Sequence, residues 1–220
     1  MSGALQRVRL DRVVRGLVAT TKGWSVEKII SLFQRNYDGD RLVRDEIVPG
    51  AEWVVAGEGI ATRKMDGTCC MVQERRLYKR YDAKGGKTPP AGFIPAQEPD
   101  PVTGHWPGWL LVGDDPGDRW HRQAMQLWLD SGLPIQGGTY ELVGPKIQGN
   151  PEKRERHGLV YHNGVGLVLD PQPPRDFAGI REYFTGRDIE GIVWHHKDGR
   201  MVKIKGKDFG IKRGANASAS

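Results

Sequence analysis

The sequence predicts an α+β fold dominated by antiparallel strands. Most of its apolar residues fall in short segments rich in β-branched and aromatic side chains, separated by Gly, Pro, Asn and Asp, which is typical of strands and hairpins. Only three segments space their apolar residues as a helix does. The 220 residues are enough to bury a core. Many short strands with few helices and no internal repeat therefore favour a mostly antiparallel α+β protein.

The first element expected is a helix. Residues 1–23 are basic and irregular, and Ser25 follows as a helix cap. Apolar residues at helical spacing extend the predicted helix to about Asn36, namely Ile29, Ile30 and Phe33. The polar run 37–40, Tyr-Asp-Gly-Asp, is expected to end it.

A single lysine lies where a strand is expected to break into a tight turn. Residues 52–56 alternate in the manner of a strand, and residues 68–72 form the next one. Between them, Asp66-Gly67 is a turn signal, because glycine tolerates positive φ and aspartate can hydrogen-bond within its own turn. Lys64 directly precedes this turn, in a good position to present an amine.

A lysine amine is a nucleophile only when it is deprotonated, so it needs desolvation or a neighbouring positive charge to lower its pKa. Arg63 supplies such a charge in the sequence. Charge and turn chemistry alone favour an ordinary solvated lysine over a nucleophile.

The middle of the chain predicts a hairpin and then a long loop. A turn at residues 74–76 leads to a returning strand over 77–81. Residues 84–109 are rich in Gly and Pro but carry aromatic residues, which argues against full disorder. A loop of this length is usually functional, so it is expected either to act as a lid or to pack on the surface.

Helix and strand signals alternate over the next 70 residues. Asp118 can cap a helix over 119–130, with one face formed by Trp120, Ala124, Leu127 and Trp128 and with Gly132 as its stop. Strands are predicted at 138–143, 159–161 and 165–169. The last two flank Asn163-Gly164, a hairpin signal.

The C-terminal part predicts a short helix and a final hairpin. The helix covers 176–184, and the hairpin strands cover 189–196 and 201–205 around the turn Asp198-Gly199. The tail, residues 213–220, is small and polar and is expected to be disordered.

The final hairpin gathers charges on one face. A two-residue turn would pair Lys197 with Arg200, and continuing this register pairs Trp194 with Lys203. Because side chains alternate between faces, Glu190, Lys203 and Lys205 are expected on one face, with Val193, Val202 and Ile204 on the core face. The alternative is a solvated outer face whose charges serve solubility.

Composition limits the functional classes. The formal net charge of +6 favours an anionic partner such as nucleic acid or a nucleotide. The two cysteines, Cys69 and Cys70, are adjacent and rarely bridge without strain, so no disulfide framework is expected. No apolar run reaches membrane-spanning length and no apolar signal core begins the chain. A cytoplasmic protein without a membrane or obligate protein partner is expected.

The stretch Lys64-Met65-Asp66-Gly67 resembles the lysine-x-Asp-Gly signature of covalent nucleotidyltransferases: DNA ligases, RNA ligases and mRNA capping enzymes. Its extension through Thr68-Cys69-Cys70 is similar to the small ATP-dependent RNA ligases that join 5′-phosphate and 3′-hydroxyl ends. Residues 140–144 resemble the third motif of that superfamily, residues 189–194 resemble the fourth, and residues 202–205 resemble the fifth. The motifs therefore follow the family's order along the chain.

The resemblance implies a fold, a cofactor set and residue roles. It implies one nucleotidyltransferase domain, an ATP-grasp-like ligase adenylation domain over 1–212, with mostly antiparallel sheets flanking a nucleotide cleft. Lys64 would be the AMP-lysine nucleophile, with ATP as substrate and Mg²⁺ or Mn²⁺ as metal. Glu190 would be the metal ligand, and Lys203 and Lys205 would contact the α-phosphate. Glu141 would bind the ribose, and Arg80 would bind the ribose and the 5′-phosphate end. Arg63, Asp66 and Gly67 would bind the nucleotide around the lysine, and Tyr161 or His162 would stack on adenine.

One departure narrows the resemblance. DNA ligases and capping enzymes usually carry an arginine where this chain has Cys69, which favours an RNA ligase with Arg80 in the arginine's place. No OB-fold domain is expected, so RNA ends should be joined better than nicked DNA. The alternatives are a GTP-using capping-type enzyme, a DNA ligase and a non-catalytic RNA-binding protein on the same fold.

Overall fold

The computed structural model describes residues 29–85 and 87–214, and these form two compact units. Unit 1 contains residues 29–64 and 163–214, and unit 2 contains residues 65–162. Both units combine sheets with a few helices, so the α+β prediction is confirmed. The features predicted before residue 29, including the Ser25 cap, and those after residue 214 lie outside the described residues. The single domain over 1–212 stays a prediction.

Unit 1 is built on a four-stranded sheet in the order β1-β12-β11-β4. All neighbours in it are antiparallel except β1 and β12, which run parallel. A separate two-stranded sheet pairs β2 with β3. The bounds are β1 Ile30–Ser31, β2 Phe33–Arg35, β3 Val43–Ile47, β4 Ile60–Lys64, β11 Gly191–His195 and β12 Met201–Lys205.

One face of this sheet carries the hydrophobic core of unit 1. Two short helices contribute to the same core, α2 (Glu52–Val55) and α4 (Phe177–Phe184). The fully buried side chains at its centre include Leu32, Ile180, Ile192, Trp194, Val202 and Ile204. The Asp176 side chain caps α4 by accepting from the Gly179 N–H at 2.8 Å, and the helix lies within the predicted range 176–184. Helices η2 (Val165–Leu167) and η3 (Gly206–Phe209) complete the unit.

Two predictions for this part of the chain are wrong. The helix predicted up to Asn36 is replaced, over the described residues, by β1 and β2. Ile30 and Ser31 pair with β12, so tertiary pairing overrides the local helical spacing. The strand predicted at 52–56 is the helix α2, in which the neighbours Trp53 and Val54 are both buried. A strand would place neighbouring side chains on opposite faces, and the strand that precedes the lysine turn is β4.

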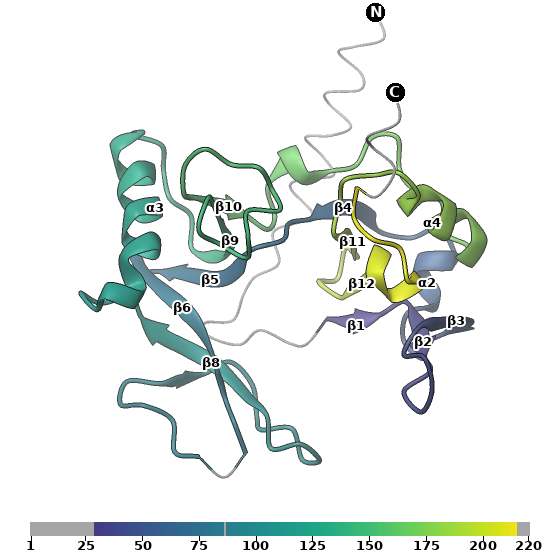
Figure 1. Cartoon of the computed structure of the whole chain (residues 1–220), viewed down its shortest axis with the longest axis horizontal. Coiled ribbons are helices and arrows are strands. Elements are labelled where there is room, and N and C mark those ends of the chain that lie inside the picture. Colours follow the sequence, from purple (N-terminus) through teal and green to yellow (C-terminus); the bar gives the residue numbers. More distant parts are fainter. Residues whose placement is uncertain (1–28, 86, 215–220) are drawn as a thin grey trace, which may run out of the picture. The chain divides into compact units, whose positions relative to one another are not determined.

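Unit 2 is built on a six-stranded antiparallel sheet in the order β10-β9-β5-β6-β8-β7 (Figure 1). The hairpin from β5 to β6 turns at Glu74 and Arg75, which both have positive φ, as the sequence predicts. The bounds are β5 Thr68–Gln73, β6 Arg76–Ala83, β7 Ile94–Pro95, β8 Trp106–Leu111, β9 Gly138–Val143 and β10 Gly158–Tyr161.

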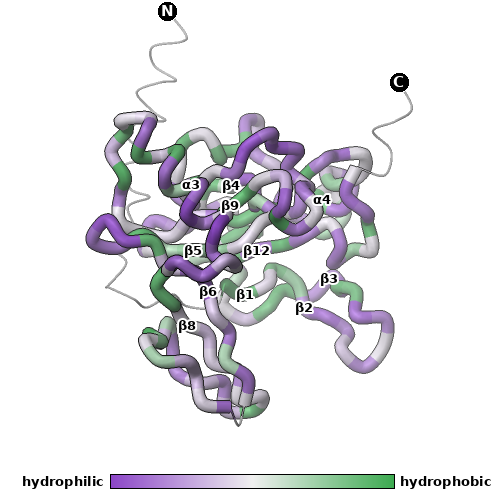
Figure 2. The backbone as a smooth tube through the Cα atoms, turned by 60° about the vertical axis from the view of Figure 1, so that its left-hand side comes forward, coloured by the Kyte–Doolittle hydropathy of each residue, from purple (hydrophilic) through white to green (hydrophobic). Residues whose placement is uncertain are grey.

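Helix α3 (Arg119–Asp130) covers one face of this sheet and lies beside β9 and β10 (Figure 1). Beneath it the core contains Cys70, Val72, Tyr140 and Leu142, and Figure 2 shows β5 as one of the hydrophobic stretches. The helix bounds match the prediction, but Leu127 is 39% exposed. Asp118, at the end of η1 (Pro116–Asp118), makes no cap; it binds Lys79 and the Gly113 N–H instead.

Two loop predictions in the middle of the chain need correction. The segment 84–109 is not an unstructured loop throughout, because its last residues begin β8 and its middle forms β7. Trp109 is fully buried in the sheet, which explains the aromatic residues of this segment. Residues 165–167 form the 3-10 helix η2 instead of a strand, so the predicted hairpin around Asn163-Gly164 does not form. Its first strand, β10, pairs with β9.

Candidate active site

The lysines of unit 1 share the face of the sheet opposite the hydrophobic core. In the observed register, Lys64 pairs with Gly191, and Gly191 pairs with Lys205. Lys203 lies two residues before Lys205 on the same strand, so the alternation of a strand places all three lysines on one face. Burial agrees, because Val202 and Ile204 are completely buried while Lys203 and Lys205 are partly exposed.

The register of the final hairpin differs from the prediction by one residue. Trp194 pairs with Val202 instead of Lys203. The His196 N–H donates to the Arg200 carbonyl, so three residues form the turn, and Gly199 adopts a φ of +95°. This extra residue moves Trp194 into the core and Val193 onto the lysine face. The predicted faces of Lys203, Lys205, Val202 and Ile204 are nevertheless correct.

Glu190 links two of the lysines. Its two carboxylate oxygens each lie 2.6 Å from an ammonium nitrogen, Oε2 from Lys64 Nζ and Oε1 from Lys205 Nζ. The Glu190 side chain is 12% exposed. Counted back from Ile192, strict alternation would place Glu190 on the core face, but Glu190 lies in a bend before β11 begins at Gly191. The bend is what brings its carboxylate to the lysines.

The charges on this face change the pKa of Glu190 and Lys203. Burial acts to raise the pKa of Glu190, but the charges and hydrogen bonds of Lys64 and Lys205 outweigh it and lower the pKa below its usual value. Burial lowers the pKa of Lys203, and the positive charges of Lys205 and Lys64 lower it further. Glu190 is therefore a stable anion in the middle of a cationic face.

Arg63 does not join this group. It pairs with Ile192 on the core side of the sheet, and its Nη2 donates to the Asp188 carbonyl at 3.3 Å. The prediction that the Arg63 charge lies beside the Lys64 amine is therefore wrong. Adjacent residues of a strand point to opposite faces, so the sequence already contained this information once β4 was placed.

Three polar residues on the lysine face were not predicted as site residues: Thr62, His195 and Ser31. Thr62 lies two residues before Lys64, and its Oγ1 is 2.9 Å from His195 Nε2. Ser31 pairs with Lys203, and its Oγ is buried without a hydrogen-bond partner among the described residues. Period-two spacing from Lys64 could have identified Thr62, whereas Ser31 depends on the parallel pairing of β1.

The turn that follows Lys64 is held by two carboxylates of unit 2. The Gly67 N–H donates to Glu141 Oε1 at 3.0 Å, and the Asp66 N–H donates to Glu152 Oε1 at 3.1 Å. Gly67 does not have the positive φ that the turn signal suggests. Its requirement for glycine comes from a close approach, since a Cβ built on it would lie 2.2 Å from the Leu142 carbonyl oxygen.

Replacing Gly67 with alanine is expected to destabilise unit 2 and to displace the lysine turn. The Leu142 backbone cannot move aside as a flexible side chain can. Overpacking of this kind typically lowers the free energy of unfolding by about 1–3 kcal/mol. Urea unfolding should therefore show a lower midpoint for Gly67→Ala at an unchanged slope. Gly113→Ala is the matched control, because a Cβ there meets no atom within 4 Å. Equal midpoints for the two variants would contradict the close-approach argument.

Glu141 and His162 form a polar group on the sheet face opposite α3. His162 Nε2 lies 2.9 Å from Glu141 Oε2, and His162 Nδ1 lies 3.0 Å from Thr139 Oγ1. An ionised carboxylate only accepts hydrogen bonds, so Nε2 of His162 carries a proton. Glu141 is 8% exposed, and its second oxygen receives the Gly67 N–H. Glu141 therefore connects the residue that follows β10 to the turn that follows the lysine.

The other two predicted site residues of unit 2 lie on different faces. Tyr161 pairs with Tyr140 and packs against it in the core under α3, with ring centroids 5.0 Å apart. This position is wrong for a residue predicted to stack on adenine beside Glu141. Arg80 lies on the Glu141 side of the sheet, where its guanidinium is 5.5 Å from the Trp109 ring centroid and its Nε donates to Asp82.

The cysteines follow the same alternation. Cys70 is buried under α3, whereas Cys69 pairs with Glu141 and is partly exposed. Neither forms a disulfide within the described residues. The adjacent pair thus occupies two faces of one strand, and Cys70 packs in the core.

Two features are absent from the described residues. In residues 29–85 and 87–214, no three His, Cys, Asp or Glu side chains gather as a metal cluster. No helix in these same ranges has the length and apolar character needed to span a membrane.

Comparison with known proteins places the sequence near one family. A family profile for RNA ligase 1 matches residues 132–218. The chain is 27% identical to the RNA ligase 1 of Pongo abelii over an alignment of 223 residues, which covers 69% of this chain and 67% of the relative. The RNA ligase 1 proteins of Danio rerio and Mus musculus show the same identity and coverage. These similarities support an RNA ligase family.

Proposed function

We propose that this protein is an ATP-dependent RNA ligase that joins 5′-phosphate and 3′-hydroxyl ends through a covalent lysine–AMP intermediate. The observation that carries the proposal is the face of unit 1 that carries Lys64, Lys203 and Lys205, two of which pair with Glu190. Three amines on one face, with a carboxylate between two of them, suit a reaction on phosphates. The similarity to RNA ligase 1 supports RNA as the substrate.

In the proposed first step Lys64 is the nucleophile. Its amine loses a proton and attacks the α-phosphorus of ATP, so that an N–P bond forms and the bond to pyrophosphate breaks. Pyrophosphate leaves with the electron pair of that bond. Lys203 and Lys205 neutralise charge on the α-phosphate, and phosphoryl-type transfer depends mostly on such positioning and electrostatic stabilisation.

Glu190 fits the role of metal ligand. Its carboxylate is a hard oxygen donor of the kind that Mg²⁺ prefers, and Mg²⁺ commonly binds proteins through one or two carboxylates plus phosphate oxygens and water. Mn²⁺ can use the same oxygen donors. The neighbouring lysines keep Glu190 ionised, as its lowered pKa shows. A bound Mg²⁺ would supply additional neutralisation of the phosphate charge.

The residues of unit 2 serve the nucleotide and the RNA end in this proposal. Glu141 already accepts from Gly67 and His162, but a carboxylate has further lone pairs for a ribose hydroxyl. Arg80 would bind the 5′-phosphate end. Asp66 shapes the turn after Lys64 through its backbone contact with Glu152. Adenine stacking is assigned to His162, because Tyr161 packs in the core while His162 lies beside Glu141.

Two further steps complete the proposed reaction. The RNA 5′-phosphate attacks the lysine-bound AMP, which breaks the N–P bond, returns the amine to Lys64 and forms a pyrophosphate-type bond between AMP and RNA. The 3′-hydroxyl of the second end then attacks the RNA phosphate. A new phosphodiester forms and AMP leaves, so one ATP is converted to AMP and pyrophosphate for each joint.

Labelled nucleotide provides the direct test. Incubation with ATP labelled at the α-phosphate is expected to label the protein in a denaturing gel, whereas GTP labelled in the same way is not. In a parallel assay, 5′-phosphorylated single-stranded or looped RNA should be joined better than nicked DNA. Labelling by GTP would instead indicate a capping-type enzyme. Efficient joining of DNA without joining of RNA would indicate a DNA ligase. RNA binding without labelling would indicate a non-catalytic protein.

A further inference from the structure

We propose that the loop between β9 and β10 binds the sugar–phosphate backbone of single-stranded RNA, at a site separate from the residues assigned to the nucleotide. The proposal rests on the RNA ligase function proposed above. The basic loop, residues 151–157, has the sequence Pro-Glu-Lys-Arg-Glu-Arg-His. Its central residues 153–156 are all exposed, so three cationic side chains reach solvent within four positions.

Two arginines of the basic loop are available for a ligand. Many arginines of this protein are engaged by carboxylates, such as Arg44 with Asp40 and Arg213 with Asp188. Arg154 and Arg156, in contrast, make no side-chain hydrogen bond or ion pair with any residue of 29–85 and 87–214. Guanidinium groups present a planar fork of donors that matches phosphate oxygens.

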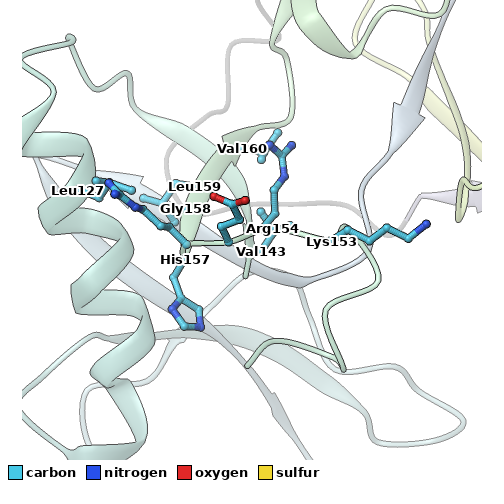
Figure 3. A pocket seen from close by; sticks show the side chains of 10 residues that line it. Leu127, Val143, Lys153, Arg154, His157, Gly158, Leu159 and Val160 are labelled. Atoms are coloured by element: carbon cyan, nitrogen blue, oxygen red, sulfur yellow. The ribbon is translucent and has the colours of Figure 1, made fainter. Parts of the chain in front are cut away.

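The basic loop borders a pocket of about 500 Å³ (Figure 3). The strands contribute aliphatic side chains to its lining, Val143, Leu159 and Val160, and helix α3 contributes Leu127. Figure 3 shows the Arg154 and Lys153 side chains extending in different directions from the loop. Apolar surface beside guanidinium groups suits a nucleotide chain, whose bases and riboses are flat or apolar while its phosphates are charged.

The basic loop is held in one conformation by contacts at both ends. Asn150 binds Arg154 twice, with Oδ1 accepting the Arg154 N–H at 2.8 Å and Nδ2 donating to the Arg154 carbonyl at 3.1 Å. The His157 ring stacks on Trp120, with centroids 4.4 Å apart. A loop that is already ordered loses less entropy when it binds a ligand.

His157 is a neutral anchor at the end of the basic loop. Its Nε2 accepts the Lys146 N–H at 3.2 Å, so the ring proton is on Nδ1, which lies 2.8 Å from Gln123 Oε1 in α3. Burial lowers the pKa of His157, and the charge of Lys146 lowers it further. The histidine therefore orders the loop without adding a charge, and the loop cations remain Lys153, Arg154 and Arg156.

The basic loop also contacts the turn that follows the proposed nucleophile. Glu152, its second residue, accepts the Asp66 N–H, and Asp66 lies two residues after Lys64 in the chain. This use of Glu152 leaves Glu155 as the one exposed acidic residue among the loop cations. A carboxylate there can accept from a ribose 2′-hydroxyl, the group that distinguishes RNA from DNA. These features favour RNA over other polyanions as the occupant.

The double variant R154Q/R156Q tests the proposal in the full chain. Its affinity for a fluorescently labelled single-stranded oligoribonucleotide is measured by anisotropy over a series of salt concentrations. Each phosphate contact to single-stranded nucleic acid contributes about 0.7 to the slope of log K against log salt. The variant is expected to bind about 10-fold more weakly and to lose about 1.4 from the slope. Arg75→Gln/Arg76→Gln, on the exposed β5–β6 turn, is the charge-matched control.

The outcomes separate this site from the proposed function. Protein–AMP formation with ATP alone requires no RNA, so R154Q/R156Q should label as the wild type does. If the wild type fails to label, the ligase mechanism is overturned, while the anisotropy measurement still reports on RNA binding by the loop. An RNA affinity and salt slope equal to those of the wild type, or an equal loss in the control, would overturn the loop site. Arg154→Lys/Arg156→Lys should restore most of the slope, because the phosphate charges are again neutralised.

Discussion

Replacing Lys64 with alanine is expected to abolish the protein–AMP adduct and RNA joining while the protein stays folded. Lys64 is the one lysine of the group that lies at the end of β4, immediately before the turn held by Glu141 and Glu152. Without its amine no N–P bond can form. The measurement is labelling with α-phosphate-labelled ATP, together with a urea unfolding curve that shows the fold is retained.

The variant Lys64→Arg separates chemistry from structure. An arginine keeps the positive charge beside Glu190, so the ion pair at 2.6 Å has a substitute. A guanidinium stays protonated in proteins and does not act as a nucleophile. We therefore expect Lys64→Arg to unfold at a denaturant concentration close to that of the wild type and to form no adduct. An adduct of unchanged yield in either variant would refute the mechanism.

The second large effect is expected at Glu190 and Lys205. Glu190→Ala leaves the lysines without their shared carboxylate, and Lys205→Ala removes one phosphate-neutralising charge. Loss of one preorganised electrostatic contact typically reduces a rate by about 10²- to 10³-fold. Single-turnover labelling with ATP should show a decrease of this size for each variant. Glu190→Gln, which keeps the shape but removes the charge, should be nearly as slow as Glu190→Ala.

Lys197→Ala is the matched control for Lys205. Lys197 is an exposed lysine in the turn between β11 and β12, on the same hairpin but away from the lysine face. Its removal changes the net charge equally and should leave the labelling rate nearly unchanged. A loss at Lys197 as large as that at Lys205 would show that the assignment of the hairpin faces is wrong.

The lysine turn illustrates what local sequence can predict. Asp66-Gly67 correctly predicted a break between two strands, and β5, β6 and α3 were predicted within a few residues of their observed bounds. Each of these signals is local, because turn chemistry and side-chain alternation involve neighbouring residues. The reason that Gly67 must be a glycine was missed, since the Leu142 carbonyl that excludes a side chain belongs to a strand far along the chain.

The final hairpin illustrates where local reasoning fails. Its strands and the lysine face were predicted, but the assumed two-residue turn shifted the register by one and misplaced Trp194 and Val193. One additional turn residue, which the sequence Lys197-Asp198-Gly199 permits equally well, decides the pairing. Burial of Trp194 in the core stabilises the observed register, and that burial exists only once the whole sheet has assembled.

The sequence by itself determined the α+β class, the lysine before the turn, and the alternation that gathers Lys203 and Lys205, because these depend on residues close together in the chain. The tertiary structure decided that Ile30–Ser31 is a strand, that Glu190 bends toward two lysines, and that Tyr161 lies in the core while His162 binds Glu141. Each of these depends on at least one partner more than 20 residues away, and no local pattern encodes the identity of such a partner.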